Sequence, residues 1–292
     1  MIVNHNNLGY ANQMKSKSQV QDTNREIAAL AVKAAKMAGA LIQKGAKDIS
    51  LLNIEQKTLH DYVSEIDRNS EAAIFDLVSQ RFPEHAFIGE EFGSLGGQQG
   101  EYTWIVDPLD GTTNFLRGIP HYAVSIAVAV GKQIHHAVIF DPAKNDLFTA
   151  SLGAGSLLNG KPIQVSNCQG VRGGLLATGI PFSGQLLEDL DCFTTTMQGM
   201  LAHHTSGIRR LGSAALDLAY VAAGRYDGYW EASLKPWDIA AGVLIVQEAG
   251  GRVADFVGDE DYLQTGNIVA ASPGLMDDMI KITSACYKGA SD

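Results

Sequence analysis

Two aspartates, Asp107 and Asp110, lie three residues apart in the stretch TWIVDPLDGTTNF, between an apolar run and a pair of threonines. Taken alone, Asp110 followed by Gly111 is a hairpin signal, and an isolated pair of this kind is more often a turn than a site. Pro108 fixes the backbone between the two acids, so both can lie at one strand end. Ionised carboxylates about 5 Å apart repel by roughly 3 kcal/mol at an effective dielectric near 20, so a cation is the expected partner.

Further carboxylates occur in similar settings along the chain. Glu90 and Glu91 end the apolar segment AFIG, Asp67 closes DYVSEID, and Asp238 follows Lys-Pro-Trp at the start of an apolar helix. Each has a structural alternative: the glutamates could be a solvated strand end, and the two aspartates could be helix N-caps. Together they would supply a ring of hard oxygen ligands. Mg²⁺ prefers such ligands and leaves positions for water and for a substrate phosphate.

Composition sets limits on the class of protein. The 292 residues carry a formal net charge of −10, and apolar residues make up 46% of them, as in an ordinary globular chain. A negative net charge argues against nucleic acid as a direct ligand, because phosphate backbones are bound mainly by clustered Lys and Arg. The longest apolar runs, residues 123–130 and 239–246, are far shorter than the roughly 20 residues of a membrane-spanning helix. No membrane segment is therefore predicted.

The cysteines and the N-terminus bear on the compartment. Cys168, Cys192 and Cys286 are odd in number and far apart, so they form no C-x-x-C pair and predict no disulfide framework. A reducing cytoplasm is the expected setting. Residues 1–24 are polar, without the apolar core and cleavage site of a secretory signal, and are predicted to be a disordered extension.

The elements that must position the acids follow from periodicity. Residues 25–46 and 68–82 have the apolar spacing of amphipathic helices, and strand-like segments bounded by Gly, Pro, Asn and Asp follow up to about residue 165. This half, 25–165, is predicted to be an α+β unit that carries the metal ligands. From about Ser166 short strands alternate with helices, which predicts a layered α/β half, 166–292, for the substrate.

Four segments stand out together along the chain: DYVSEID (61–67), GEE (89–91), DPLDGTTNF (107–115) and WDIAAGVLIVQEAGG (237–251). In this order and spacing they resemble the inositol monophosphatase family of Mg²⁺-dependent, lithium-sensitive phosphatases, and GIRRLGSAALDLAYVAAGRYDGYWE is most similar to its bacterial members. The resemblance runs from about residue 25 to the C-terminus and implies an α/β fold of alternating helix and sheet layers, shared with fructose bisphosphatases.

The resemblance implies two to three Mg²⁺ ions in one site. Glu90, Asp107 and the backbone carbonyl of Leu109 would hold the first ion, and Asp107, Asp110 and Asp238 the second. A third, weaker ion would lie near Glu90 and, through water, near Asp67. Two close metal ions can stabilise the attacking and leaving oxygens of an in-line displacement, and one can acidify the attacking water.

The resemblance also implies catalytic and substrate-binding roles. Thr112 would position the attacking water with Asp67, beside Glu90, and the backbone N–H groups of Gly111 and Thr112 would face phosphate oxygens. Glu231 could instead be a solvated strand end, and the Gly-Ser-Ala-Ala segment a turn that caps a helix. The residues implied for the alcohol half of the substrate are Gly212, Ser213, Ala214, Glu231 and Asp238.

The expected reaction is hydrolysis of myo-inositol 1-phosphate to myo-inositol and phosphate. The ending GTTNF (111–115) resembles the inositol phosphatases more than the adenosine bisphosphate phosphatases, which commonly carry Lys-Glu in place of Thr-Asn. Fructose 1,6-bisphosphate and histidinol phosphate are alternative substrates, because related proteins hydrolyse them. A binding role with the transcription machinery is the alternative from another class, since some bacterial relatives have one. A homodimer is what the family implies.

Overall fold

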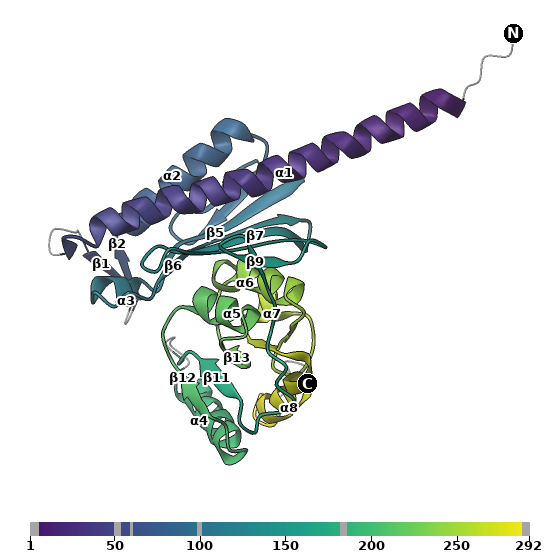
Figure 1. The fold of residues 1–292 in the computed structure, drawn as a ribbon. Helices are drawn as coiled ribbons and strands as arrows, with labels where there is room; N and C mark the ends of the chain where they lie inside the picture. The colour runs from purple at the N-terminus through teal and green to yellow at the C-terminus, as the bar shows by residue number, and fades with distance from the viewer. Residues whose placement is uncertain (1–5, 50–53, 59–60, 98–100, 182–185, 288–292) are drawn as a thin grey trace, which may run out of the picture.

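The computed structural model describes residues 6–49, 54–58, 61–97, 101–181 and 186–287, and it stacks them as alternating layers of helices and sheets (Figure 1). The α/β class with alternating layers, predicted from the sequence, is confirmed. The outermost layer is a pair of helices, followed by a large sheet, two further helices, a smaller sheet and a last helix layer.

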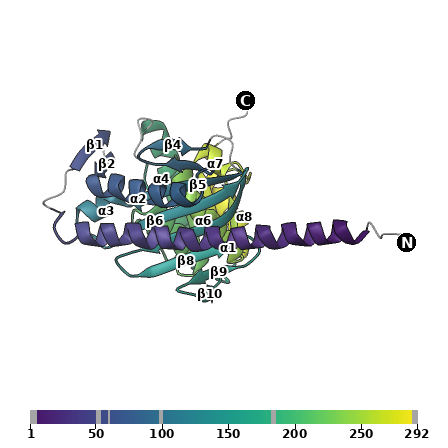
Figure 2. The same ribbon diagram turned by 90° about the horizontal axis from the view of Figure 1, so that it is seen from above.

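The outermost layer consists of α1 (Asn6–Gly45) and α2 (Glu65–Arg81), which lie beside each other on one face of the large sheet (Figures 1 and 2). Helix α1 begins at Asn6, well before the expected start at residue 25, and its N-terminal part projects beyond the sheet. Residues 1–5 lie outside the described part, and the extension over 1–24 stays a prediction. The buried positions of α1 recur every three or four residues, as one face of a helix requires: Ile27, Ala31, Ala34, Ala35, Ala38 and Ile42.

The large sheet has the order β10-β9-β8-β7-β6-β5-β3-β4, and its neighbours pair antiparallel except for β3 with β5. A separate ribbon pairs β1 (Ile54–Thr58) with β2 (Asp61–Ser64). The strands of the large sheet are β3 (Ala86–Gly89), β4 (Gly93–Gly96), β5 (Tyr102–Asp110), β6 (Ala123–Val130), β7 (Gln133–Asp141), β8 (Asp146–Ser151), β9 (Ser156–Leu158) and β10 (Lys161–Ile163).

The second half supplies the remaining layers. Helices α5 (Ala214–Ala222) and α6 (Pro236–Glu248) lie between the large sheet and a five-stranded sheet of order β12-β11-β13-β15-β14 (Figure 1). Helices α4 (Leu186–Ala202) and α8 (Pro273–Thr283) cover its outer face, and α3 (Thr112–Leu116) and α7 (Tyr262–Thr265) are short. The strands of this sheet are β11 (Leu175–Thr178), β12 (Gly207–Arg209), β13 (Gly228–Glu231), β14 (Arg252–Ala254) and β15 (Ile268–Ala271).

The two faces of β6 explain how α6 comes close to the sheet. Val124, Ile126 and Val128 pack into the core under α1 and α2, whereas the alternating alanines on the other face pack into the core around α5 and α6. Helix α6 is therefore enclosed between two sheets, and residues 239–246 are all buried. This burial accounts for the continuous apolar run of α6. Among the described helices, none is both long and apolar enough to cross a bilayer.

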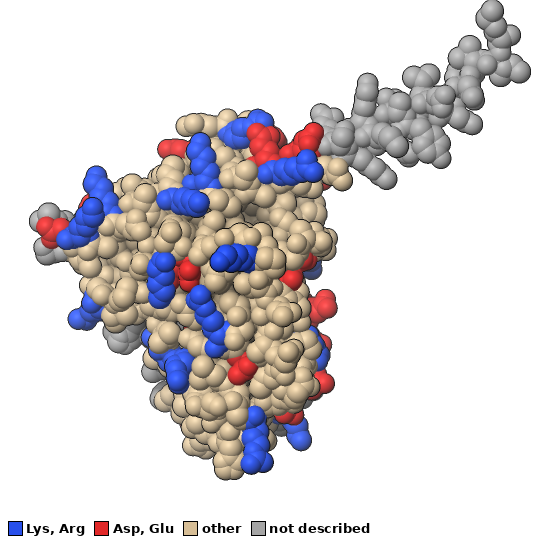
Figure 3. Space-filling model, viewed as in Figure 1, with Lys and Arg blue, Asp and Glu red and all other residues tan. Residues whose placement is uncertain are grey.

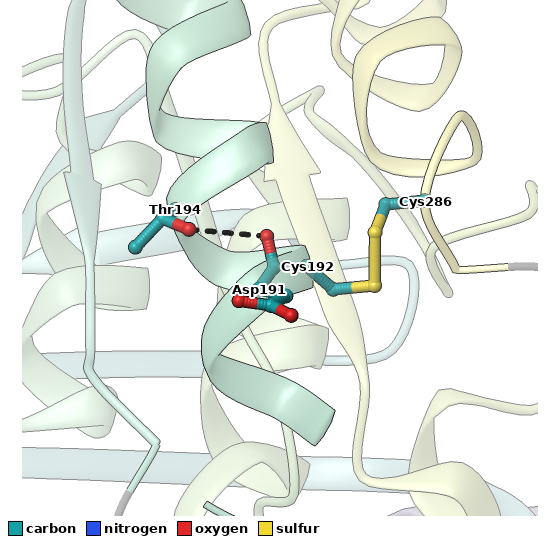
Figure 4. The surroundings of a disulfide bond; sticks show 4 residues. All are labelled: Asp191, Cys192, Thr194 and Cys286. Atoms are coloured by element: carbon teal, nitrogen blue, oxygen red, sulfur yellow. Dashed lines mark hydrogen bonds between the residues drawn. A yellow bond between two sulfur atoms is a disulfide. The ribbon is translucent and has the colours of Figure 1, made fainter. Parts of the chain in front are cut away.

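The cysteine prediction is wrong in one respect. Cys192 on α4 and Cys286, three residues beyond α8, form a disulfide whose Cα atoms are 5.3 Å apart (Figure 4). The pair is 94 residues apart in sequence, and only the packing of α4 against α8 brings it together. Spacing alone could not reveal it. Cys168 is a free thiol.

Opening this disulfide is expected to lower thermal stability. In the chain-entropy model a crosslink across 94 residues stabilises by about 4.6 kcal/mol, because it restricts the unfolded chain. The double variant Cys192→Ser, Cys286→Ser should therefore unfold roughly 10 °C below the oxidised parent in a thermal scan. Cys168→Ser is the matched control and should leave the midpoint unchanged. Equal midpoints for the double variant and the oxidised parent would contradict the prediction.

Candidate functional site

Strand register brings the first two acids together. Strand β3 runs parallel to β5 with Gly89 opposite Val106, so Glu90 and Asp107 each occupy the next position at the same end of the sheet. The Glu90 amide continues the ladder by donating to the Val106 carbonyl at 3.2 Å. Two segments that are distant in sequence thus present carboxylates at neighbouring strand ends.

A bulge in β5 positions the second aspartate. Asp107 pairs with Ser125 and Asp110 with Ala123, so β5 carries one more residue than β6 over this stretch. The Leu109 amide donates to Oδ1 of Asp107 at 2.9 Å. The turn that follows needs glycine, since Gly111 has φ +92° and an added Cβ would lie 3.0 Å from a backbone oxygen.

Thr112 lies between two oxygens at the start of α3. Its hydroxyl is 3.0 Å from Oδ1 of Asp67 and 3.0 Å from the Leu109 carbonyl, and its single proton can be donated to one of them at a time. The other oxygen of Asp67 accepts from the Ser64 amide at 2.9 Å. Asp67 is thus the third residue of α2 and part of a capping box, and it does not end a strand. Burial raises the pKa of Asp67.

Asp110 joins the N-terminus of α5 to the site. Its Oδ2 accepts from the Ser213 hydroxyl at 2.6 Å and from the Ala215 amide at 2.7 Å. Ser213 is also the N-cap of α5, where its hydroxyl accepts from the Leu216 amide. One carboxylate therefore fixes the start of a helix that is more than 100 residues away in sequence.

Asn114, a residue without an assigned role in the sequence prediction, makes the second connection. Its buried side-chain amide donates to the carbonyls of His121 and Leu211, both at 2.8 Å. The first bond closes the turn after α3, and the second links that turn to the segment before Ser213. The two bonds keep Gly111 and Gly212 beside each other.

The last two acids come from the second half of the chain. Asp238 is the third residue of α6, and its Oδ2 accepts from the Lys235 amide at 2.6 Å. Glu231 ends β13 and accepts a hydrogen bond from the Tyr229 hydroxyl. The carboxylate of Glu231 lies against Gly179, where an added Cβ would be 1.8 Å from its Oε1. Position 179 therefore has to be glycine for Glu231 to keep this place.

These residues surround one pocket of about 480 Å³. All of the predicted site residues except Asp67 line it, and Asp67 reaches it through its contact with Thr112. The pocket also has walls that the sequence prediction did not assign: Thr113, Asn114, Arg117, Ile180, Arg210 and Leu234. The predicted residues are thus brought together by the fold, from both halves of the chain.

The carboxylates in this pocket repel one another when they are ionised. Burial raises the pKa of Asp107 well above its ordinary value, and the neighbouring carboxylates Glu90, Asp110 and Asp238 raise it further. The pKa of Asp110 is raised to about 6 and that of Glu231 to about 7, in both cases mainly by burial. Such a set of acids is stabilised by a cation.

The donor set fits Mg²⁺, because it consists of carboxylate and carbonyl oxygens. In the ranges that the structure describes, no group of three His, Cys, Asp or Glu side chains already has the spacing of a bound ion. One oxygen each of Asp110 and Asp238 is hydrogen bonded to a backbone amide instead.

Glu71 is a buried residue of the site that sequence reasoning missed. Its side chain accepts from the amides of Glu91 and Phe92, both at 2.8 Å, and it lies against Gly89, where an added Cβ would be 2.2 Å from Oε1. Glu71 therefore holds the turn that carries Glu90. The available signal was its position four residues after Asp67, which places both acids on one face of α2.

Replacing Glu71 by glutamine is expected to weaken Mg²⁺ binding at the site that contains Glu90. Glutamine has one acceptor oxygen, so its NH₂ group would oppose one of the two backbone amides and shift the turn of Glu90. We expect the Mg²⁺ concentration that gives half of the metal-induced rise in unfolding temperature to increase at least about tenfold. The exposed Glu65→Gln on the same helix is the matched control. An unchanged Mg²⁺ dependence of Glu71→Gln would contradict this role.

The fold and the pocket define a layered α/β protein with a carboxylate-rich site built from both halves of the chain. The model of the inositol monophosphatase family matches residues 23–287, and the chain belongs to that family.

Similar proteins span nearly the whole chain. Nus factor SuhB of Escherichia coli is 45% identical over 254 residues, which are 86% of this chain and 93% of that protein. The crystal structure of extragenic suppressor protein SuhB from Bartonella henselae is 40% identical with a TM-score of 0.83, and the match covers 90% of this chain and 99% of that one. Inositol monophosphatase from Anabaena is 34% identical with a TM-score of 0.76, over 90% and 97% of the two chains.

Proposed function

We propose that this protein is a Mg²⁺-dependent phosphomonoesterase that hydrolyses myo-inositol 1-phosphate. The observation that carries the proposal is the single pocket in which Glu90, Asp107, Asp110, Thr112 and Asp238 meet. Membership of the inositol monophosphatase family supports phosphatase chemistry and a metal requirement. Two to three Mg²⁺ ions per site, sensitivity to lithium, a homodimer and a cytoplasmic location complete the proposal.

The metal ligands would be the carboxylates of Glu90, Asp107, Asp110 and Asp238 with the carbonyl of Leu109. Bound Mg²⁺ would offset the negative charge of these carboxylates and lower the pKa of a bound water. The protein's own side chains and backbone groups would hold the water, orient the phosphate and recognise the alcohol.

Thr112 and Asp67 would hold the attacking water. When the Thr112 hydroxyl donates to Asp67 over their 3.0 Å contact, its lone pairs are free to accept a proton of that water. The water is thereby turned so that its own lone pair points at phosphorus. A threonine hydroxyl is too weak an acid to act as a base unaided, so its role is orientation. The backbone N–H groups of Gly111 and Thr112 would donate to phosphate oxygens.

Glu231 would recognise the alcohol half of the substrate. Its carboxylate lines the pocket and has a pKa of about 7, so it is largely ionised above that pH and can accept hydrogen bonds from vicinal hydroxyls. The turn of Gly212, Ser213 and Ala214 would contact the same sugar or polyol. A pocket of about 480 Å³ has room for a phosphorylated six-carbon ring.

Phosphate release from four substrates tests the proposal. The purified protein is assayed with inositol 1-phosphate, fructose 1,6-bisphosphate, histidinol phosphate and adenosine 3′,5′-bisphosphate, with and without Mg²⁺ and Li⁺. We expect inositol 1-phosphate to give the highest kcat/KM, only with Mg²⁺ and with inhibition by Li⁺. Preference for another of the four would change the substrate but keep the chemistry. No release from any of them would overturn the phosphatase proposal.

A role with the transcription machinery is a second candidate, because a relative of 45% identity is named a Nus factor. On the face shown in Figure 3, Lys and Arg of the described residues are scattered singly, with Asp and Glu among them. Such a face favours a protein partner over direct nucleic-acid contact. A pull-down of RNA polymerase and its elongation factors with the parent and with Asp107→Asn tests this candidate. Equal capture by both would show a partner role that does not need catalysis.

A further inference from the structure

Strand β13 is the central strand of the smaller sheet, and two of its side chains point to the same face. Tyr229 and Glu231 are two residues apart, so both lie on the side of α5 and α6, whereas Trp230 between them packs into the core on the outer side. The Tyr229 side chain is fully buried in the core that the two sheets share, and Glu231 lines the pocket. The strand therefore places a buried phenol directly behind the carboxylate that would recognise the alcohol.

The Tyr229 hydroxyl has one proton and gives it to Glu231. It donates to Oε2 of Glu231, and this is the only hydrogen bond of the hydroxyl among the described residues. Asp217 of α5 is a second buried acid near the pair, and neither of its carboxyl oxygens has a hydrogen-bond partner in the part of the chain that the structure describes. Burial and the charge of Glu231 raise the pKa of Asp217 well above its ordinary value. The phenol proton thus stabilises a carboxylate at Glu231 and not at Asp217.

The surroundings of Glu231 make this hydrogen bond important for its charge. Burial raises the pKa of Glu231 to about 7, and the hydrogen bond from Tyr229 limits that rise. A hydrogen bond to a carboxylate is stronger than one between two neutral groups, so the phenol favours the ionised form. A substrate hydroxyl needs that form as its acceptor. The charged groups that face Glu231 are mostly acids, which disfavour a further negative charge: Asp110, Asp217, Asp238 and the single cation Arg210.

The contacts of Glu231 also fix its orientation. The phenol holds Oε2, and the carboxylate packs against Gly179, where an added Cβ would collide with both of its oxygens. A carboxylate has about four lone-pair positions, and Tyr229 occupies one of them. Two adjacent hydroxyl groups of a substrate can donate together to the positions that face the pocket. A site built to bond a substrate hydroxyl discriminates against an analogue that lacks it.

We propose that Tyr229 is a positioning residue that determines specificity, because its hydrogen bond holds Glu231 in the orientation that accepts from two adjacent hydroxyl groups of the substrate alcohol. The substrate class that this arrangement selects is a phosphate ester of a vicinal diol, in preference to a phosphate ester of a simple alcohol. Tyr229 is buried and acts only through Glu231. The inference rests on the proposed phosphatase function, since it concerns the same pocket.

Two substrates that differ only in their hydroxyl groups test this role. Phosphate release from inositol 1-phosphate and from cyclohexyl phosphate is measured at saturating Mg²⁺ with the parent and with Tyr229→Phe, which removes only the phenol oxygen. We expect the KM for inositol 1-phosphate to rise about tenfold with kcat within about threefold, because binding of the ground state and of the transition state is weakened alike. The kcat/KM for cyclohexyl phosphate should change less than about twofold. A general structural effect would lower the activity on both substrates.

A double-mutant cycle shows whether Tyr229 acts through Glu231. In the background of Glu231→Gln, Tyr229→Phe should change the KM for inositol 1-phosphate less than about twofold, because the interaction is already lost. Tyr226→Phe is the matched control, since Tyr226 is a buried tyrosine just before β13 that does not line the pocket, and it should keep the KM of the parent.

The outcomes separate this role from the proposed function. If the parent is active, an unchanged KM of Tyr229→Phe, an equal loss on both substrates, an undiminished effect in the Glu231→Gln background, or the same rise in KM for Tyr226→Phe would overturn the role of Tyr229 and leave the phosphatase proposal standing. If the parent released no phosphate from either substrate, the proposed function would fail and this role would fail with it.

Discussion

Asp107→Asn is expected to lose at least about 1,000-fold of the Mg²⁺-dependent phosphatase activity, because it replaces the carboxylate that both main metal ions are expected to share. The side chain is 2% exposed and is surrounded by Glu90, Asp110 and Asp238. Phosphate release at saturating Mg²⁺ measures the loss, and retention of more than about a tenth of the parent activity would refute the metal assignment.

The same variant should be more stable than the parent when no metal is bound. The pKa of Asp107 is raised in the folded state, so ionising it costs folding free energy. Asp107 therefore does not lower the free energy of unfolding at a pH below its pKa in the unfolded chain. The free energy of unfolding then falls as the pH rises through the pKa of Asp107 in the folded protein. Asparagine avoids this loss, and the advantage of the variant in metal-free buffer should grow from pH 4 to pH 8. Mg²⁺ should raise the unfolding temperature of the parent and leave that of the variant nearly unchanged.

Asp146→Asn is the matched control for both measurements. Asp146 lies at the start of β8 and pairs with Arg225 at the surface, away from the pocket. A surface ion pair contributes at most about 1 kcal/mol. The control should therefore keep its activity and its response to Mg²⁺. A fall of activity in both variants would point to a general effect of removing a negative charge.

Thr112→Val should lower kcat about 100-fold and leave KM and the Mg²⁺ dependence nearly unchanged. Valine keeps the shape of threonine but removes the hydroxyl that is 3.0 Å from Asp67, so the water loses its acceptor while the metal ligands stay in place. Steady-state kinetics with inositol 1-phosphate measures the split between kcat and KM.

Thr112→Ser separates chemistry from packing in this case. Serine restores the hydroxyl and removes one methyl group, so its kcat should return to within about tenfold of the parent. If Thr112→Val kept kcat within threefold of the parent, or if serine failed to restore activity to a folded protein, Thr112 would not be the residue that orients the water.

Local patterns predicted most of the elements and singled out several carboxylates of the pocket, whereas the other pocket residues were implied by the resemblance to a known family. The apolar spacing of α1 and α2 and the Gly-rich boundaries of the strands are local signals, and the structure places helices and strands there. The acids at 107, 110 and 238 stood out because each follows or precedes an apolar segment that had to be buried. Buried carboxylates need a cation or a hydrogen-bond donor beside them. This requirement identified these acids as candidate site residues from the sequence alone.

Features that depend on contacts between distant segments were not visible. Cys192 and Cys286 meet only because α4 packs against α8, and neither residue has a local signal. In the sequence Glu71 is one of several polar residues of α2. In the structure its carboxylate accepts hydrogen bonds from two backbone amides of a turn about 20 residues later. Asn114 likewise acts on a carbonyl 97 residues away. Such roles follow from the tertiary arrangement and not from spacing.

The burial of α5 and α6 between the two sheets has a consequence for cutting the chain. Ile139 and Phe148 of the large sheet share one core with Leu216, Leu244 and other residues of those helices. A fragment that ended near residue 165 would expose that whole sheet face to water. We therefore expect separately expressed halves to aggregate alone and to regain a soluble form only when refolded together, so that the two halves act as one inseparable folding unit.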